Sequence, residues 1–135
     1  MMTGALAGIL AALSGCGLRP PTAREKLNAE VEEVDHVTSS EVTRSGDGTM
    51  RTRMSGDIYF DVSGDELLTA LDAAWLPVVE YVHDLDDGDG RRQSLVTAHG
   101  EDGSTAEPRD LLGPDYDDHG QPVPFSAFFE HYGIG

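Results

Sequence analysis

The chain has 135 residues, with nine basic and 25 acidic side chains and a net charge of −16. This length suits one folded domain, and a hydrophobic content of 39% is typical of a globular core rather than a disordered chain. So large a negative charge repels phosphate backbones and anionic headgroups. It therefore argues against nucleic acid as a partner and against adhesion to a membrane through charge alone.

The N-terminal segment is apolar and contains a lone cysteine. The run from Ala5 to Leu13 has the length of a signal-peptide core and is too short to span a bilayer as a helix. It ends in Leu13-Ser14-Gly15-Cys16, and Cys16 is the only cysteine of the chain. An unpaired cysteine in an exported protein suggests that the thiol is covalently modified. The alternative is a buried, unmodified thiol in a packed helix.

Leu13-Ser14-Gly15-Cys16 resembles the lipobox of bacterial lipoproteins, in which Leu and two small residues precede a Cys. The resemblance implies that diacylglycerol is attached to the sulfur of Cys16 and that the chain is cut between Gly15 and Cys16. Two acyl chains hold a protein firmly at a bilayer. We therefore expect a signal peptide over residues 1–15, a lipidated tether over residues 16–21, and one domain over residues 22–135 outside the cytoplasm.

Two helices are predicted from their N-terminal signals. Capping-box patterns stand at Thr22 and at Ser63, each with a Glu three residues later. Apolar residues then recur at helical spacing, which predicts helices to about residue 34 and residue 82. Pro77 lies inside the second helix and should kink it or end its regular part just before the proline.

Three strands are predicted. Residues 37–44 and residues 50–62 are joined by turn-forming residues and read as a hairpin, with the first strand at the edge of the sheet. Apolar residues alternate along the second strand, which predicts a core face and a wet face. Gly56 interrupts the core face and predicts a bulge or a close backbone contact. Residues 93–99 predict the third strand, and residues 109–112 give a weaker signal for a fourth.

The chain closes with aromatic residues at helical spacing from Phe125 to Tyr132, followed by Gly133 as a C-cap. The order helix, strand, strand, helix, strand, helix predicts an α+β two-layer sandwich of three or four strands, covered on one face by the second helix. A right-handed crossover is expected if the second and third strands run parallel. The acidic region around residues 100–122 is expected to be partly flexible.

This layout is similar to the small modules found in short lipoproteins of high-GC Gram-positive bacteria such as actinobacteria. It also has a looser similarity to the BON domain, an envelope module with αββ repeats. The resemblance implies a cell-envelope protein and does not identify a ligand.

Two acidic segments suggest a divalent-cation site. The first does not match the ligand positions of an EF-hand loop at either end. Its two interpretations are a looser Ca²⁺ site and a solvated loop whose carboxylates repel one another. Its candidate ligands are Asp84, Asp86, Asp87 and Asp89. The second, residues 115–119, offers one His and three carboxylates but no second His at ligand spacing.

A candidate binding face lies on the wet side of the second strand, which carries Arg51, Arg53 and Tyr59. In a chain so short of positive charge, two arginines and a tyrosine on one sheet face could bind an acidic partner. The alternative is that the arginines pair locally with Glu41 or Asp57.

No nucleophile elbow, zinc-protease motif or phosphate loop occurs in the sequence, so we predict no catalytic residues. The expected function is that of a membrane-anchored, noncatalytic binding or interaction module of the cell envelope. No cofactor is expected beyond the lipid on Cys16. The alternatives are a cation-binding lipoprotein that uses the acidic loops and an envelope enzyme of unknown reaction.

Overall fold

The structure is a computed structural model that describes residues 22–45, 53–116 and 123–134. Its elements in chain order are α2 (Ala23–Glu32), β1 (Val37–Ser45), β2 (Arg53–Phe60), α3 (Asp65–Leu85), β3 (Gln93–His99), β4 (Thr105–Ala106), the 3₁₀ helices η1 (Pro108–Leu111) and η2 (Pro114–Tyr116), β5 (Val123–Pro124) and α4 (Phe125–Tyr132). The predicted α+β class and the order of its main elements are confirmed. The sheet has five strands rather than three or four, because β4 and β5 add short pairings to β3.

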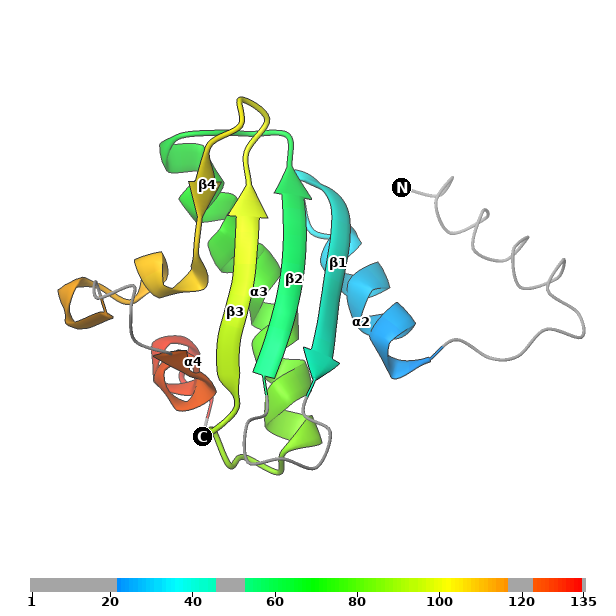
Figure 1. The fold of residues 1–135 in the computed structure, drawn as a ribbon, viewed down its shortest axis with the longest axis vertical. Helices are drawn as coiled ribbons and strands as arrows, with labels where there is room; N and C mark the ends of the chain where they lie inside the picture. The colour runs from blue at the N-terminus through cyan, green and yellow to red at the C-terminus, as the bar shows by residue number, and fades with distance from the viewer. Residues whose placement is uncertain (1–21, 46–52, 117–122, 135) are drawn as a thin grey trace, which may run out of the picture.

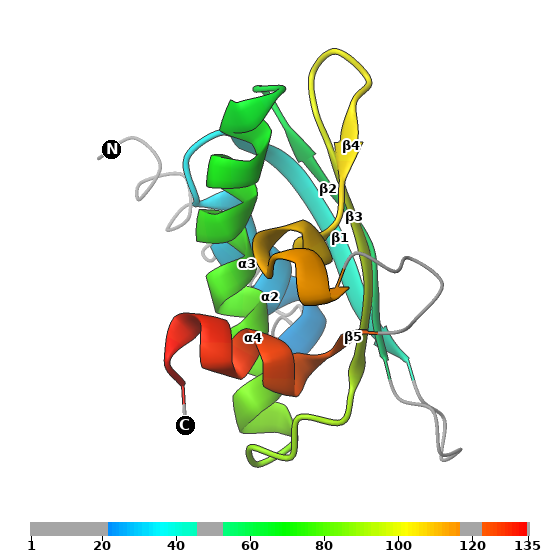
Figure 2. The ribbon, with the colours of Figure 1, turned by 90° about the vertical axis from the view of Figure 1, so that its left-hand side faces the viewer.

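The molecule has two layers, a mixed sheet and a layer of helices. The strand order is β1-β2-β3-β4, with β5 also paired to β3. β1 runs antiparallel to β2, and β2 runs parallel to β3. In Figure 1, α3 passes behind the sheet and β3 lies to the left of β2, which is the expected right-handed crossover. Figure 2 shows α2, α3 and α4 on the same side of the sheet.

The core lies between the sheet and the helices. Trp75 in α3 is fully buried and stacks on Phe125, with ring centroids 5.5 Å apart, and meets Phe128 edge-on at 5.6 Å. The Tyr132 hydroxyl donates a 2.6 Å hydrogen bond to the Asp72 carbonyl. These contacts fix α4 on α3, and burial of each large apolar side chain contributes about 1.5–3 kcal/mol.

The alternation predicted for the second strand is confirmed. Met54, Ile58 and Phe60 are buried on one face of β2, whereas Arg53 and Tyr59 are exposed on the other. One face of the sheet therefore supplies the core, and the opposite face is left to solvent.

Gly56 marks a close backbone contact, which is one of its two predicted roles. It lies opposite Val42 in the β1–β2 register and has φ of +126°. A Cβ placed there would lie 2.0 Å from the carbonyl oxygen of Glu41. Only glycine allows the two strands to approach this closely.

The outer edge of β1 is covered by side chains of α2. Asn28 donates from Nδ2 to the Val42 carbonyl at 2.8 Å, and its Oδ1 accepts from the Val42 N–H at 2.8 Å. Glu32 accepts from the Ser40 N–H at 2.9 Å. These side chains take the place of a neighbouring strand, so α2 occupies an edge that another chain could otherwise pair with.

The start and the course of α3 differ from prediction. Gly64 is the N-cap, with φ of 63°, and no side chain caps the helix, so the capping box predicted at Ser63 is wrong. The helix also continues through Pro77, so of the two effects expected of the proline the end of the helix is wrong, and the kink stays a prediction. The side chains that follow the proline, Val78 and Val79, are fully buried. Their burial offsets the roughly 3 kcal/mol that an interior proline costs.

The strand predicted over residues 109–112 is also wrong. Those residues belong mainly to η1, and the strand pairing falls earlier, at β4. Pro108 fixes the first turn of η1, and Arg109 is 6% exposed with its Nε donating to Glu107 Oε1 at 3.0 Å. Burial of this arginine requires a turn that brings its carboxylate partner close. The acidic region after residue 100 therefore contains β4, η1 and η2 in its described part.

Candidate binding face

The sheet face turned away from the helices faces the viewer in Figure 1. No helix or strand of the described part of the chain covers it (Figure 2). The strand registers place its side chains in rows across β1, β2 and β3. We call this surface the open face; its rows are Ser39, Tyr59 and His99; Glu41, Asp57 and Thr97; Thr43, Ser55 and Leu95; and, at one end, Arg53 and Gln93.

A stacked pair lies in the first row of the open face. The rings of Tyr59 and His99 have centroids 4.6 Å apart and planes 15° from parallel. His99 Nε2 lies 2.8 Å from Asp57 Oδ1, which orients the imidazole. Tyr59 and Leu95, 38% and 45% exposed, are the large hydrophobic residues exposed among those that the structure describes. The open face thus offers an aromatic pair, an aliphatic side chain and a carboxylate on a sheet face that no described helix covers.

The predicted binding residues are placed only in part. Arg53 and Tyr59 are both exposed on β2, but they lie six positions apart, which is about 20 Å along a strand. Arg51 lies outside the described residues. The cross-strand neighbour of Tyr59 is instead His99, and Leu95 lies four residues away along β3, opposite Ser55. Neither residue is among the predicted binding residues. Both lie on the outward parity of that strand, so a parallel β2–β3 register would have found them.

The predicted local pairing of the arginines is not seen for Arg53. Its partners in the strand registers are Ser45 and Gln93, and no ion pair joins it to another described residue. Glu41 and Asp57 lie directly across from each other, and Asp57 contacts His99. Two facing carboxylates make the middle of the open face acidic.

Two carboxylates of the predicted calcium loop bind arginines. Asp86 accepts from Arg92 Nε at 2.8 Å and from Nη2 at 3.0 Å, and the Arg92 side chain is only 8% exposed. Asp89 accepts from Arg91 Nε at 2.9 Å and from Nη2 at 2.8 Å. The hydrogen bonds from Arg91 hold the pKa of the Asp89 carboxyl below its usual value. Both carboxylates therefore already have a cationic partner.

The other predicted cation ligands are scattered. Asp84 lies in the last turn of α3, and Asp87 follows the helix with φ of 55°. Asp115 is exposed in η2, and residues 117–119 lie outside the described residues. Among the described side chains, no group of three or more His, Cys, Asp or Glu is placed to hold a metal ion. The cation site stays a prediction from sequence.

Cys16, Gly15 and the rest of the first 21 residues lie outside the described residues. The helices of the described part are each too short or too polar to span a bilayer. No protein-family model matches the chain, and comparisons with curated proteins and with solved structures gave no match either.

Proposed function

We propose that the protein is an extracytoplasmic lipoprotein, held at the cell membrane by diacylglycerol on Cys16, whose domain binds another envelope component without catalysis. The observation that carries this proposal is Leu13-Ser14-Gly15-Cys16 shortly before the folded domain. The domain begins at the capping box of Thr22, six residues after Cys16. A cut before Cys16 would remove no described element, so processing and folding are compatible.

The charge of the chain also supports a covalent anchor. All 25 acidic and nine basic side chains follow Cys16 in the sequence, so the processed domain would carry the full net charge of −16. A domain this negative is repelled by anionic headgroups, and attached acyl chains would hold it at the bilayer against that repulsion.

Replacing Cys16 by Ser is expected to move the protein from the membrane fraction to the soluble fraction of its native host. The hydroxyl of serine does not take the place of the thiol that receives the lipid. Mass spectrometry of the N-terminal peptide should find a diacylglyceryl Cys16 in the parent and an unlipidated peptide in the variant. The control is Ser14→Ala, which keeps a small residue before the cysteine. The anchor is wrong if the Cys16→Ser variant partitions with membranes as the parent does.

The binding role rests on the open face. Tyr59 and Leu95 are exposed on it, on either side of the acidic middle row. Aromatic side chains are enriched at protein interfaces, which favours a protein partner over a small molecule.

A photo-cross-linking amino acid in place of Leu95 is expected to give a discrete adduct in intact cells. The same amino acid in place of Thr69, an exposed residue of α3 on the helix side, is the matched control and should give none. Gel mobility and mass spectrometry of the adduct provide the measurement. Equal adducts at both positions, or none at Leu95, would contradict binding through the open face.

A further inference from the structure

Charge is unevenly distributed over the domain. Six of the basic side chains lie in residues 22–26, 43–45, 53 and 84–92, which we call the tether end. These are Arg24, Lys26, Arg44, Arg53, Arg91 and Arg92. The tether end also holds five acidic side chains, so it is close to neutral. The rest of the described chain has one basic and 17 acidic side chains.

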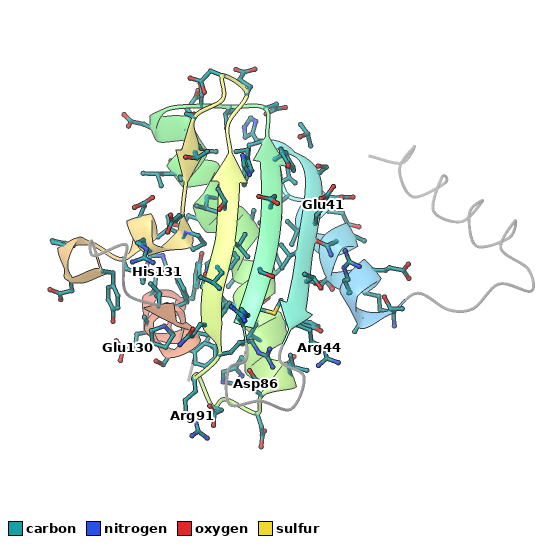
Figure 3. All side chains as sticks on the ribbon, viewed as in Figure 1. Glu41, Arg44, Asp86, Arg91, Glu130 and His131 are labelled. Atoms are coloured by element: carbon teal, nitrogen blue, oxygen red, sulfur yellow. The ribbon has the colours of Figure 1, made fainter. Side chains whose placement is uncertain are left out.

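The fold brings these separate segments together at the end where the tether enters. Ser45 pairs with Arg53, and Arg53 pairs with Gln93, which directly follows the loop after α3. α2 runs antiparallel to β1, because Asn28 bonds Val42 whereas Glu32, one turn later, bonds Ser40. The first turn of α2 therefore lies beside the end of β1. Figure 3 shows the labelled Arg44, Asp86 and Arg91 at this same end.

Four of these basic side chains are free to meet a ligand. Arg24, Lys26, Arg44 and Arg53 are exposed, and none has an ion pair with a described residue. Arg91 and Arg92, by contrast, are each bound to an aspartate.

Most carboxylates of the tether end already accept hydrogen bonds from other groups of the protein. Asp86 and Asp89 bind the two paired arginines, and Glu25 Oε1 accepts from the Thr22 N–H at 2.8 Å. Asp84 and Asp87 remain, and both lie on the side of this end formed by the C-terminus of α3. The side formed by α2, β1 and β2 is thus the electropositive part of an acidic molecule.

Taking the anchorage at Cys16 as given, we propose that Arg24, Lys26, Arg44 and Arg53 contact anionic lipid headgroups and orient the anchored domain. The six residues from Cys16 to Thr22 span at most about 20 Å, which keeps the tether end near the bilayer. Charges interact with the membrane surface only within about 8 Å at physiological salt. The eight residues of β2 span about 26 Å. The acidic opposite end is therefore out of reach of the membrane charge only when the strands run perpendicular to the bilayer.

This orientation has a consequence for the open face. When the strands run perpendicular to the bilayer, the side chains of Tyr59 and Leu95 project from the sheet in a direction parallel to the membrane plane. A partner that is itself anchored in the same membrane would meet the open face without passing beneath the domain.

The test uses the whole chain, coupled through the Cys16 thiol to a maleimide lipid in nanodiscs. The nanodiscs contain phosphatidylcholine alone or phosphatidylcholine with phosphatidylglycerol, and a trace of lipid with a gadolinium-chelate headgroup. Adding phosphatidylglycerol is expected to broaden the amide signals of Arg24 and Arg44 and to restore those of Asp65 and Asp102 at the opposite end. Uniform broadening at both ends would overturn the proposal.

The variant with Arg24→Gln, Lys26→Gln, Arg44→Gln and Arg53→Gln is expected to lose the difference between the two lipid mixtures. Amide dispersion checks that it is folded. The control with Glu66→Gln and Glu101→Gln, at the opposite end, should keep the difference. A difference that survives in the first variant would also overturn the proposal. Because the anchor is chemical, the result is independent of whether Cys16 is lipidated in the cell.

Discussion

Replacing Gly56 by Ala is expected to remove about 4 kcal/mol or more of the free energy of unfolding, a large part of the roughly 5–15 kcal/mol that a folded domain has. The φ of +126° is disfavoured for any residue with a Cβ, and that Cβ would lie 2.0 Å from the Glu41 carbonyl oxygen. The overlap is with backbone, so no rotamer change relieves it. β1 must move away from β2, which breaks the ladder between them.

Urea denaturation followed by circular dichroism measures this loss, and Gly103→Ala is the matched control. Gly103 has φ of +87°, but a Cβ there meets nothing within 4 Å. Its substitution costs only the backbone strain of a left-handed residue, about 1–2 kcal/mol. Equal losses in the two variants would mean that the close contact at Gly56 contributes nothing.

Replacing Asn28 by Ala is expected to cost about 3 kcal/mol and to make the protein prone to aggregation. The side chain bonds both the N–H and the carbonyl of Val42, and its Oδ1 also accepts from the Ser40 hydroxyl. Leaving such part-buried groups unpaired costs about 1–3 kcal/mol each, partly recovered where water enters. The exposed edge of β1 could then pair with a second chain.

Urea denaturation gives the stability of the Asn28→Ala variant, and light scattering on storage gives its aggregation. Glu30→Ala, an exposed position in the last turn of α2, is the control and should change the free energy of unfolding by less than about 0.5 kcal/mol. A variant of Asn28 that is as stable and monomeric as the control would show that α2 does not protect the edge.

The parts of the fold that depend on local patterns were predictable. Three local patterns each predict one element. They are the alternation along β2, the apolar residues at helical spacing before Gly133 in α4, and the capping box at Thr22 in α2. The residues 93–99 predicted as the third strand are those of β3. In all of these the signal lies within a few residues of the element that it specifies.

The parts that depend on tertiary contacts were not predictable. β4 and β5 have two residues each and exist only because β3 is beside them. α3 runs through Pro77 because the following turns are buried, which local propensity does not record. The open face shows the same limit: the position of Tyr59 on the wet side of β2 could be predicted, but its contact with His99 requires the register of a distant strand.

The parallel pairing of β2 with β3 also sets when the chain can fold. Arg53 meets Gln93, 40 residues later, so β2 has only one neighbour until the final third of the chain is available. A two-stranded hairpin is marginally stable in water, and contacts between distant residues form slowly. The central pairing of the sheet therefore forms only after about two thirds of the chain is present, and a shorter N-terminal piece would lack it.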